Sequence, residues 1–258
     1  MKIDEMAARD AIGDAVVRRF SSWTFPLVVL LVAAAIGIGI FVFLAGPTVE
    51  EVQGNIQGNT YSPTADTSRA RITIDGSDFS IPANYTMHRR SRKSGDHENV
   101  PMHALLPDLE PWSAGKAGEF ASNLAASRVI RFTLSVDRDR LPYEEKFNRG
   151  IRPRADNENG EPGPYGLTSY RFQPGTGYEG TEWYSAAMPG GKMLVMRCDP
   201  SANADFGSTC IRVTRLDDGI GLTYRFKRSQ LQYWKETDAR IMALIASFRP
   251  RKKQLRAS

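Results

Sequence analysis

The feature that most constrains this chain is an uncharged apolar segment near its N-terminus. No charged residue occurs between Arg19 and Glu50, and Leu27 to Ala45 gives 19 consecutive apolar or small residues. That length matches the ~20 residues with which a helix crosses a bilayer core. Lipid offers no hydrogen-bond partners, so backbone at that depth must be helical. The sequence therefore predicts a transmembrane helix over residues 25–46, with the lipid bilayer as one partner.

A cleaved signal peptide is the alternative interpretation of this segment. Signal peptides have an apolar region of ~7–15 residues and a small-x-small cleavage site. The segment here is longer, and the residues before Gly46 are Phe43, Leu44 and Ala45, which form a poor cleavage site. We therefore expect an uncleaved signal anchor.

The charges on either side of the segment predict its orientation. Four basic residues precede it and two acidic residues follow it: Lys2, Arg9, Arg18 and Arg19, then Glu50 and Glu51. The positive-inside rule keeps the basic side in the cytoplasm. Residues 1–24 are accordingly predicted to be cytoplasmic, and everything beyond the span lies in the periplasm if the source is a bacterium. This predicts a single-pass protein of the bacterial inner membrane.

Small residues recur at four-residue spacing within the apolar segment. Ala33 and Gly37 form one small-xxx-small pair, and Ala35 and Gly39 form another. Such pairs let two membrane helices approach closely. Self-association through these four residues is therefore a second, weaker expectation.

Composition divides the rest of the chain into three parts. Residues 47–69 are rich in Gly, Asn, Thr, Ser and Pro, have few large apolar residues, and read as a linker. Residues 70–249 have the mixed composition of a folded domain. Residues 250–258 form a basic tail.

The domain begins with strand patterns. Residues 70–76 alternate apolar and polar side chains, and residues 78–82 follow across an Asp75–Gly76 turn, which is typical of a hairpin. Residues 128–136 alternate in the same way. Residues 137–166 show no clear pattern and are expected to form a long loop, which is either a functional insertion or a mobile segment.

A series of closely spaced strands and one helix complete the domain. The strand-like runs are residues 167–173, 181–188, 192–198, 209–216 and 219–227, separated by turn residues. Ser229 and Gln232 have the spacing of a helix capping box. An apolar stripe follows, formed by Leu231, Trp234, Ile241, Leu244, Ile245 and Phe248. The pattern predicts an α+β fold in which a C-terminal helix packs on an antiparallel sheet.

The two cysteines of the chain, Cys198 and Cys210, flank one predicted hairpin loop. Exported proteins keep disulfides, whereas cytosolic ones rarely do. A zinc site would need two further ligands at suitable spacing, and a redox dithiol is usually Cys-x-x-Cys. We therefore expect a structural disulfide.

Two other motifs in this region are incomplete. Asp199, Ser201, Asn203 and Asp205 alternate like the start of a calcium loop, but the required Gly and Glu are replaced by Ala204 and Cys210. Asp205-Phe206-Gly207 lies too close to the glycines at 175, 177 and 180 for a kinase, and no His-Arg-Asp occurs. We predict polar turns at both places.

All three histidines, His88, His97 and His103, lie within 16 residues of one another. With Asp96 and Glu98 beside them they offer the ligand types of a zinc or copper site, although the spacing fits no common motif. A solvated loop is the simpler interpretation. This segment is the basis of one of two functional hypotheses, the alternative one: a metal-dependent periplasmic enzyme, or a metal or pH sensor.

No catalytic set is recognisable otherwise. The carboxylate pairs Asp137/Asp139 and Glu144/Glu145 have basic neighbours, which favours ion pairs over acid–base catalysis. The formal charge of +5 comes from scattered residues without a nucleic-acid-binding motif, so no nucleic-acid partner is expected. No cofactor is predicted.

The segment "FSIPANY" (79–85) and the closing stretch "LTYRFKRSQLQYWKETDARIMALIASF" (222–248), together with the single span, resemble poorly characterised bacterial inner-membrane proteins with a periplasmic domain. The resemblance implies location and architecture. Aromatic residues in the strands add a composition often used in contact surfaces: Tyr165, Tyr170, Phe172, Tyr178, Trp183 and Tyr184. The leading hypothesis is a membrane-anchored periplasmic binding or accessory domain for an envelope protein partner.

Overall fold

The computed structural model describes residues 24–45, 60–139 and 141–250. The chain divides into two compact units, residues 1–55 and 56–258. Helix α2 (Thr24–Ala45) is the described element of the first unit. Side chains of α2 are described for residues 26–36, and no helix among the described residues is long and apolar enough to cross a membrane.

Two predictions for the N-terminal part fall wholly or partly outside the described residues. The cytoplasmic segment, residues 1–24, is one of them. The other is self-association. Ala33 and Ala35 are exposed on α2, but the side chains beyond residue 36, which include the positions of Gly37 and Gly39, are not described. Self-association stays a prediction.

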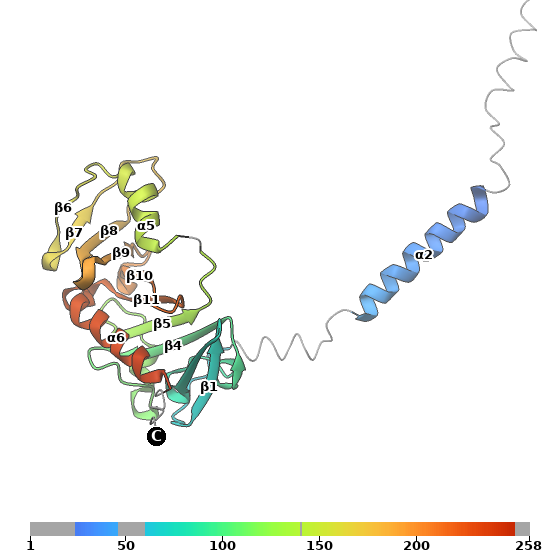
Figure 1. Ribbon diagram of the computed structural model, residues 1–258, viewed down its shortest axis with the longest axis horizontal. Helices are drawn as coiled ribbons and strands as arrows, with labels where there is room; N and C mark the ends of the chain where they lie inside the picture. Colours follow the sequence, from blue (N-terminus) through green and yellow to red (C-terminus); the bar gives the residue numbers. More distant parts are fainter. Residues whose placement is uncertain (1–23, 46–59, 140, 251–258) are drawn as a thin grey trace, which may run out of the picture. The chain divides into compact units, whose positions relative to one another are not determined.

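The second unit contains a large and a small sheet. The large sheet has the order β4-β5-β11-β10-β9-β8-β7-β6, and Figure 1 shows the strands following one another in this order. Its strands are β4 (Asn99–Leu105), β5 (Val129–Ser135), β6 (Glu161–Pro162), β7 (Thr168–Tyr170), β8 (Glu182–Ala187), β9 (Met193–Asp199), β10 (Thr209–Arg215) and β11 (Gly221–Lys227). Every neighbouring pair in it is antiparallel, as predicted.

The small sheet has the order β2-β1-β3. Its strands are β1 (Arg69–Ile74), β2 (Ser77–Pro82) and β3 (Gly95–Asp96). β1 and β2 pair as the expected hairpin. Asp75 and Gly76 both have positive φ, 46° and 76°, which is the backbone of a tight hairpin turn.

Short helical segments connect these strands. In the described part of the second unit, the α-helices are α4 (Ala117–Ala121), α5 (Tyr143–Lys146) and α6 (Trp234–Phe248). A π-helical segment, η4 (Phe147–Ile151), continues α5. The 3₁₀ segments are η1 (Ala83–Tyr85), η2 (Arg90–Arg92), η3 (Ala114–Lys116), η5 (Arg152–Arg154), η6 (Pro164–Gly166), η7 (Pro189–Gly191), η8 (Ala204–Phe206) and η9 (Arg228–Tyr233).

The main core lies between α6, the small sheet and one face of the large sheet. Alternate residues of β11, Leu222, Tyr224 and Phe226, point into it because successive side chains of a strand face opposite ways. All six residues of the predicted apolar stripe belong to this core, five buried and Leu244 partly buried. The predicted α+β fold, with a C-terminal helix packed on an antiparallel sheet, is confirmed.

The start of this helix differs from the prediction. Ser229 lies in η9, and its hydroxyl donates to the carbonyl of Ala125 (2.6 Å) instead of capping a helix. Tyr233 holds the N-cap position of α6 without a side-chain cap bond. The capping box is therefore wrong, because the serine is used in a tertiary contact.

Residues 137–166 also differ from the expected loop. This segment contains α5, η4, η5 and β6. Phe147 is fully buried with Tyr170, Trp183 and Val195 in a second core, on the face of the sheet opposite α6. The sequence pattern missed it because the segment contributes only a few apolar residues, and their partners lie on later strands.

The folded domain begins before residue 70. Tyr61 bridges to His88, and the amide of Ser62 donates to the carbonyl of Met87 (2.9 Å). Residues 60–68, part of the predicted linker, are thus held against the domain.

A buried ion pair joins the large sheet to α6. Arg212 of β10 contacts Asp238 of α6, with side chains only 6% and 4% exposed. The Tyr224 hydroxyl donates to the same carboxylate (2.9 Å). Burial raises the pKa of Tyr224 to about 12, so this phenol stays a donor. The carboxylate therefore has two partners from two adjacent strands.

The strands β9 and β10 are also joined covalently. Cys198 and Cys210 lie opposite each other in the antiparallel register and form a disulfide with a Cα–Cα distance of 3.9 Å. The predicted pairing is confirmed. No other cysteine exists in the chain.

Replacing Asp238 by Ala should lower the free energy of unfolding by about 3–5 kcal/mol, because it leaves the Arg212 charge buried without a counter-ion. Urea denaturation of the full chain in detergent measures this loss. Asp217→Ala is the control, since Asp217 forms an exposed pair with Lys192 and should matter little. Equal effects of the two substitutions would contradict the structural role of the buried pair.

The double variant Cys198→Ala/Cys210→Ala should lose about 3 kcal/mol of unfolding free energy, since a link closing a short loop restricts the unfolded chain. Denaturation with and without dithiothreitol checks this. Reductant should lower the stability of the parent and leave the double variant unchanged. A parent that is insensitive to reductant under unfolding conditions would rule the disulfide out.

Candidate functional site

One face of the large sheet remains partly open at its centre. Over β5, β11 and β10, most residues pointing away from α6 are half-buried or exposed. We call them the central sheet face: Arg131, Thr133, Ser135, Ile211, Val213, Thr223 and Arg225. On the β8 and β9 side, the second core covers the sheet. On the β4 side, a third cluster formed by Leu105, Phe120 and Val129 covers it.

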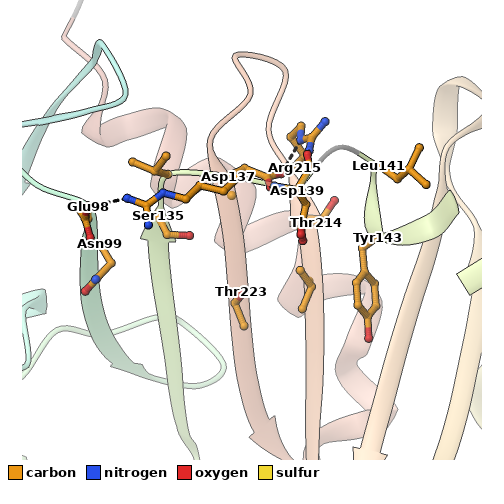
Figure 2. A pocket seen from close by; sticks show the side chains of 14 residues that line it. Glu98, Asn99, Ser135, Asp137, Asp139, Leu141, Tyr143, Thr214, Arg215 and Thr223 are labelled. Carbon is orange, nitrogen blue, oxygen red and sulfur yellow. Dashed lines mark hydrogen bonds and ion pairs between the residues drawn. The ribbon is translucent and has the colours of Figure 1, made fainter. Parts of the chain in front are cut away.

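A hollow of about 370 Å³ lies at one end of this face. It is lined by the ends of β5, β10 and β11, by Glu98 and Asn99 at the start of β4, and by Tyr143 of α5. Figure 2 shows Asp137, Asp139 and Arg215 gathered at its rim, between Glu98 and Tyr143.

The charged groups of the hollow are paired with one another. Arg215 contacts Asp137, and Lys146 of α5 contacts Asp139. Arg138 binds Glu98 at 2.6 Å. This ion pairing matches what basic neighbours in the sequence had indicated for Asp137 and Asp139.

The hydrogen bond from Arg215 lowers the pKa of Asp137, so this carboxyl is ionised at any physiological pH. Arg215 also donates to the carbonyl of Asp139 (2.5 Å), and the Thr214 hydroxyl donates to Glu144 (3.2 Å). A permanently ionised, ion-paired carboxylate is a poor general acid. These contacts attach the 137–146 segment to the end of the sheet.

A row of residues that includes three arginines crosses the central sheet face at the end away from the hollow. The cross-strand register places the following residues side by side on one face: His103, Arg131, Arg225, Ile211, Arg197 and Trp183. Three of the six are arginines. The row runs from β4 to β8 and therefore spans the uncovered strands and both covered flanks.

The three arginines differ in whether an acidic side chain pairs with them. Arg197 binds Asp199 through two contacts, 2.6 and 2.9 Å, and its guanidinium lies over the Trp183 ring. Arg131 and Arg225 are direct cross-strand neighbours. Among the described residues neither has a side-chain hydrogen bond or an ion pair. Two like charges therefore occupy adjacent positions on one face of the sheet, with no counter-ion among the described residues.

A third basic group lies next to this pair. Lys227 follows Arg225 on the same face of β11, and its ammonium donates to the carbonyl of Phe206 (2.6 Å). Burial, with the nearby charge of Arg131, lowers the pKa of Lys227. The positive charge of Arg131 thus disfavours protonation of the neighbouring Lys227 ammonium.

The structure places the three histidines in different surroundings. His88 contacts the carbonyl of Thr60 (3.2 Å), and His97 contacts that of Lys93 (2.7 Å). His103 is 1% exposed and packs against the rings of Tyr61 and Phe120. Within residues 60–139 and 141–250 no three His, Cys, Asp or Glu side chains are grouped to hold a metal ion.

The polar residues of the cysteine loop bond to the loop itself. Asn203 accepts a hydrogen bond from the amide of Asp205 (2.9 Å), and Asp199 is occupied by Arg197. The loop also docks on the segment after α4, where the amide of Ala125 donates to the carbonyl of Asp205 (2.8 Å). Turn formation and docking account for these side chains.

Most of the aromatic residues proposed for a contact surface lie in cores instead. Tyr184 is buried in the main core. Tyr170 and Trp183 are buried in the second core, and Phe172 and Tyr178 are half-buried against it. Tyr165 is the exception at 54% exposed, with φ of 58°. The aromatic surface is therefore wrong for five of the six residues. Tyr184 faces the main core on the α6 side of the sheet, and the other four pack in or against the second core together with Phe147 of η4.

Sequence reasoning missed Arg131 and Arg225. Both occupy polar positions of alternating strands, which is a signal for the open face of a sheet. Their proximity depends on the pairing of β5 with β11, which the sequence pattern does not specify.

The pKa of His103 is lowered to about 4 by burial and by the charge of Arg131, against 6.5 in an unfolded chain. His103 therefore takes up its proton at a lower pH in the folded state than in the unfolded state. Stability is complete above pH 6.5 and should decrease by up to about 3 kcal/mol between pH 6.5 and 4. Denaturation at several pH values measures this, and His103→Leu should flatten the profile.

His97→Leu is the matched control, because His97 is bonded near the surface and its removal should keep the slope. An unchanged slope in His103→Leu would contradict the burial of a neutral imidazole.

No protein-family model and no curated protein sequence matches this chain. Among solved structures, an immunity protein of the Stenotrophomonas maltophilia type IV secretion system has a similar fold, with a TM-score of 0.53 at 19% identity. The match covers 74% of this chain and 99% of that chain. The Neisseria meningitidis iron-regulated outer membrane lipoprotein FrpD gives a TM-score of 0.45 at 14% identity, over 74% of this chain and 97% of that one. The first similarity establishes a shared α+β fold.

Proposed function

We propose that this chain is a membrane-anchored domain that binds a protein partner in the bacterial cell envelope. The observation that carries the proposal is the central sheet face, which is flanked by two covered regions and ends in a hollow whose carboxylates are held in ion pairs. Groups committed to ion pairs do not supply acid–base chemistry, whereas an uncovered face with unpaired charge is suited to contact.

The anchor and the location rest on the sequence. The run from Leu27 to Ala45 is uncharged and 19 residues long, close to the ~20 residues with which a helix crosses a bilayer core. A disulfide in the domain fits an oxidising compartment. These features support a cytoplasmic N-terminus and a periplasmic domain.

The similar fold of an immunity protein suggests what the partner is. We carry that role over as part of the proposal: the partner is a toxic protein that reaches the envelope, and this chain neutralises it by binding. An anchored inhibitor would meet such a partner at the membrane surface.

A strain lacking this chain should lose in co-culture with its parent, and the full chain supplied from a plasmid should restore its survival. Counting viable cells of both strains measures this. The chain without residues 25–46 is the control and should not protect, because it would stay in the cytoplasm. Equal survival of the deletion strain and the parent would overturn the neutralising role.

Alkaline phosphatase fused after Ser258 should be active, since this enzyme needs the periplasm to form its disulfides. The same fusion without residues 25–46 should be inactive. An inactive fusion to the full chain, made in normal amounts, would overturn the proposed orientation.

A further inference from the structure

The pairing of Arg131 with Arg225 has an energetic cost. Like charges directly opposite each other on neighbouring strands destabilise a sheet. Here Arg131 and Arg225 lie in register on adjacent central strands, with their side chains on the same face and without a counter-ion among the described residues. Arg225 is exposed and Arg131 half-buried, so both are accessible at the surface. A partner carboxylate placed between them would relieve the repulsion.

We propose that Arg131 and Arg225 bind the carboxylates of a short acidic segment in the protein partner. This rests on the proposed function and specifies the face and the chemistry of the contact. Guanidinium groups bind carboxylates through two parallel hydrogen bonds, a geometry that favours arginine over lysine at such sites.

None of the described neighbours of the pair supplies a counter-ion. His103 lies next to Arg131 in the row and is neutral in its buried position. Ile211 lies next to Arg225, and beyond it Arg197 already occupies Asp199. Lys227 adds a further positive charge and is bonded to a neutral carbonyl. This end of the face thus carries an excess of positive charge.

An apolar corner borders this cationic patch. Leu124 is 56% exposed and Phe206 41% exposed. The bond between Ala125 and Asp205 holds their two loops together, and Lys227 contacts Phe206 through its carbonyl oxygen. A small hollow lined by Ser122, Asn123, Ser127, Arg131, Arg225 and Lys227 adjoins the corner. This combination fits a segment that presents acidic residues beside an apolar one.

The distribution of charge favours a short acidic segment over an extended polyanion. At the other end of the face, Asp137, Asp139 and Glu98 line the hollow and are already matched by basic groups. Nucleic acid needs a run of basic residues that follows its phosphates. The positive patch here is limited to Arg131 on β5 and to Arg225 and Lys227 on β11.

Site-specific photo-crosslinking of the full chain in its native membrane tests the proposal. A photoreactive phenylalanine derivative at Thr223, within the central sheet face, should cross-link a protein whose attached peptide contains clustered Asp or Glu. The same derivative at Lys235, exposed on α6, is the position control and should not capture it.

In the variant Arg131→Gln/Arg225→Gln the cross-link from Thr223 should fall roughly tenfold or more, as expected for the loss of two charged contacts. Arg89→Gln/Arg90→Gln removes two exposed arginines elsewhere and should leave the cross-link unchanged. Thermal unfolding of the Arg131→Gln/Arg225→Gln variant should be unchanged or shifted upward, because its repulsion is gone. This measurement separates lost binding from lost folding.

Some negative results would contradict the inference alone, and others would contradict the proposed function. A cross-link that survives in Arg131→Gln/Arg225→Gln, or a captured peptide without acidic residues, would overturn the inference and leave the proposed function standing. So would capture of lipid, nucleic acid, a second copy of the chain, or the chain's own residues 46–59, which include Glu50 and Glu51. Capture of no protein from any position on the domain would overturn the proposed function itself.

Discussion

The contact between Arg212 and Asp238 is the constraint on which the domain depends. It places one charge of each sign inside the main core, where an unpaired charge would be prohibitively costly. Asp238 also accepts from Tyr224, so a single carboxylate fixes two strands and α6 in one arrangement. An apolar contact tolerates small shifts, whereas this pair does not. The register of α6 on the sheet is therefore set by charge and then completed by the apolar stripe.

Once α6 has closed one face of the large sheet, the character of the other face follows. Phe147 and Trp183 bury the part over β7 to β9, and Phe120 with Val129 buries the part near β4. The strands between them keep polar residues, and two of these are arginines without a partner among the described residues. The same sheet thus combines a dry face that stabilises the fold with an exposed strip whose charges are available for another molecule.

The sequence predicted the main features of the fold because they depend on local patterns. Alternation identified β5 and the strands from β7 to β11, and the spacing of Leu231, Trp234 and Ile241 identified the helix. The cysteine pairing followed from two residues at the ends of one hairpin. These are interactions between neighbours in the chain or within one element.

The remaining features depend on contacts between distant segments. The burial of Phe147 needs Tyr170 and Trp183, and the unpaired arginines become a pair only through the β5–β11 register. That register also has a kinetic consequence. Arg131 and Arg225 come from segments far apart in the sequence, so the cationic pair is absent until the sheet has closed. A partner that recognises both side chains would bind the finished fold and ignore an incompletely folded chain.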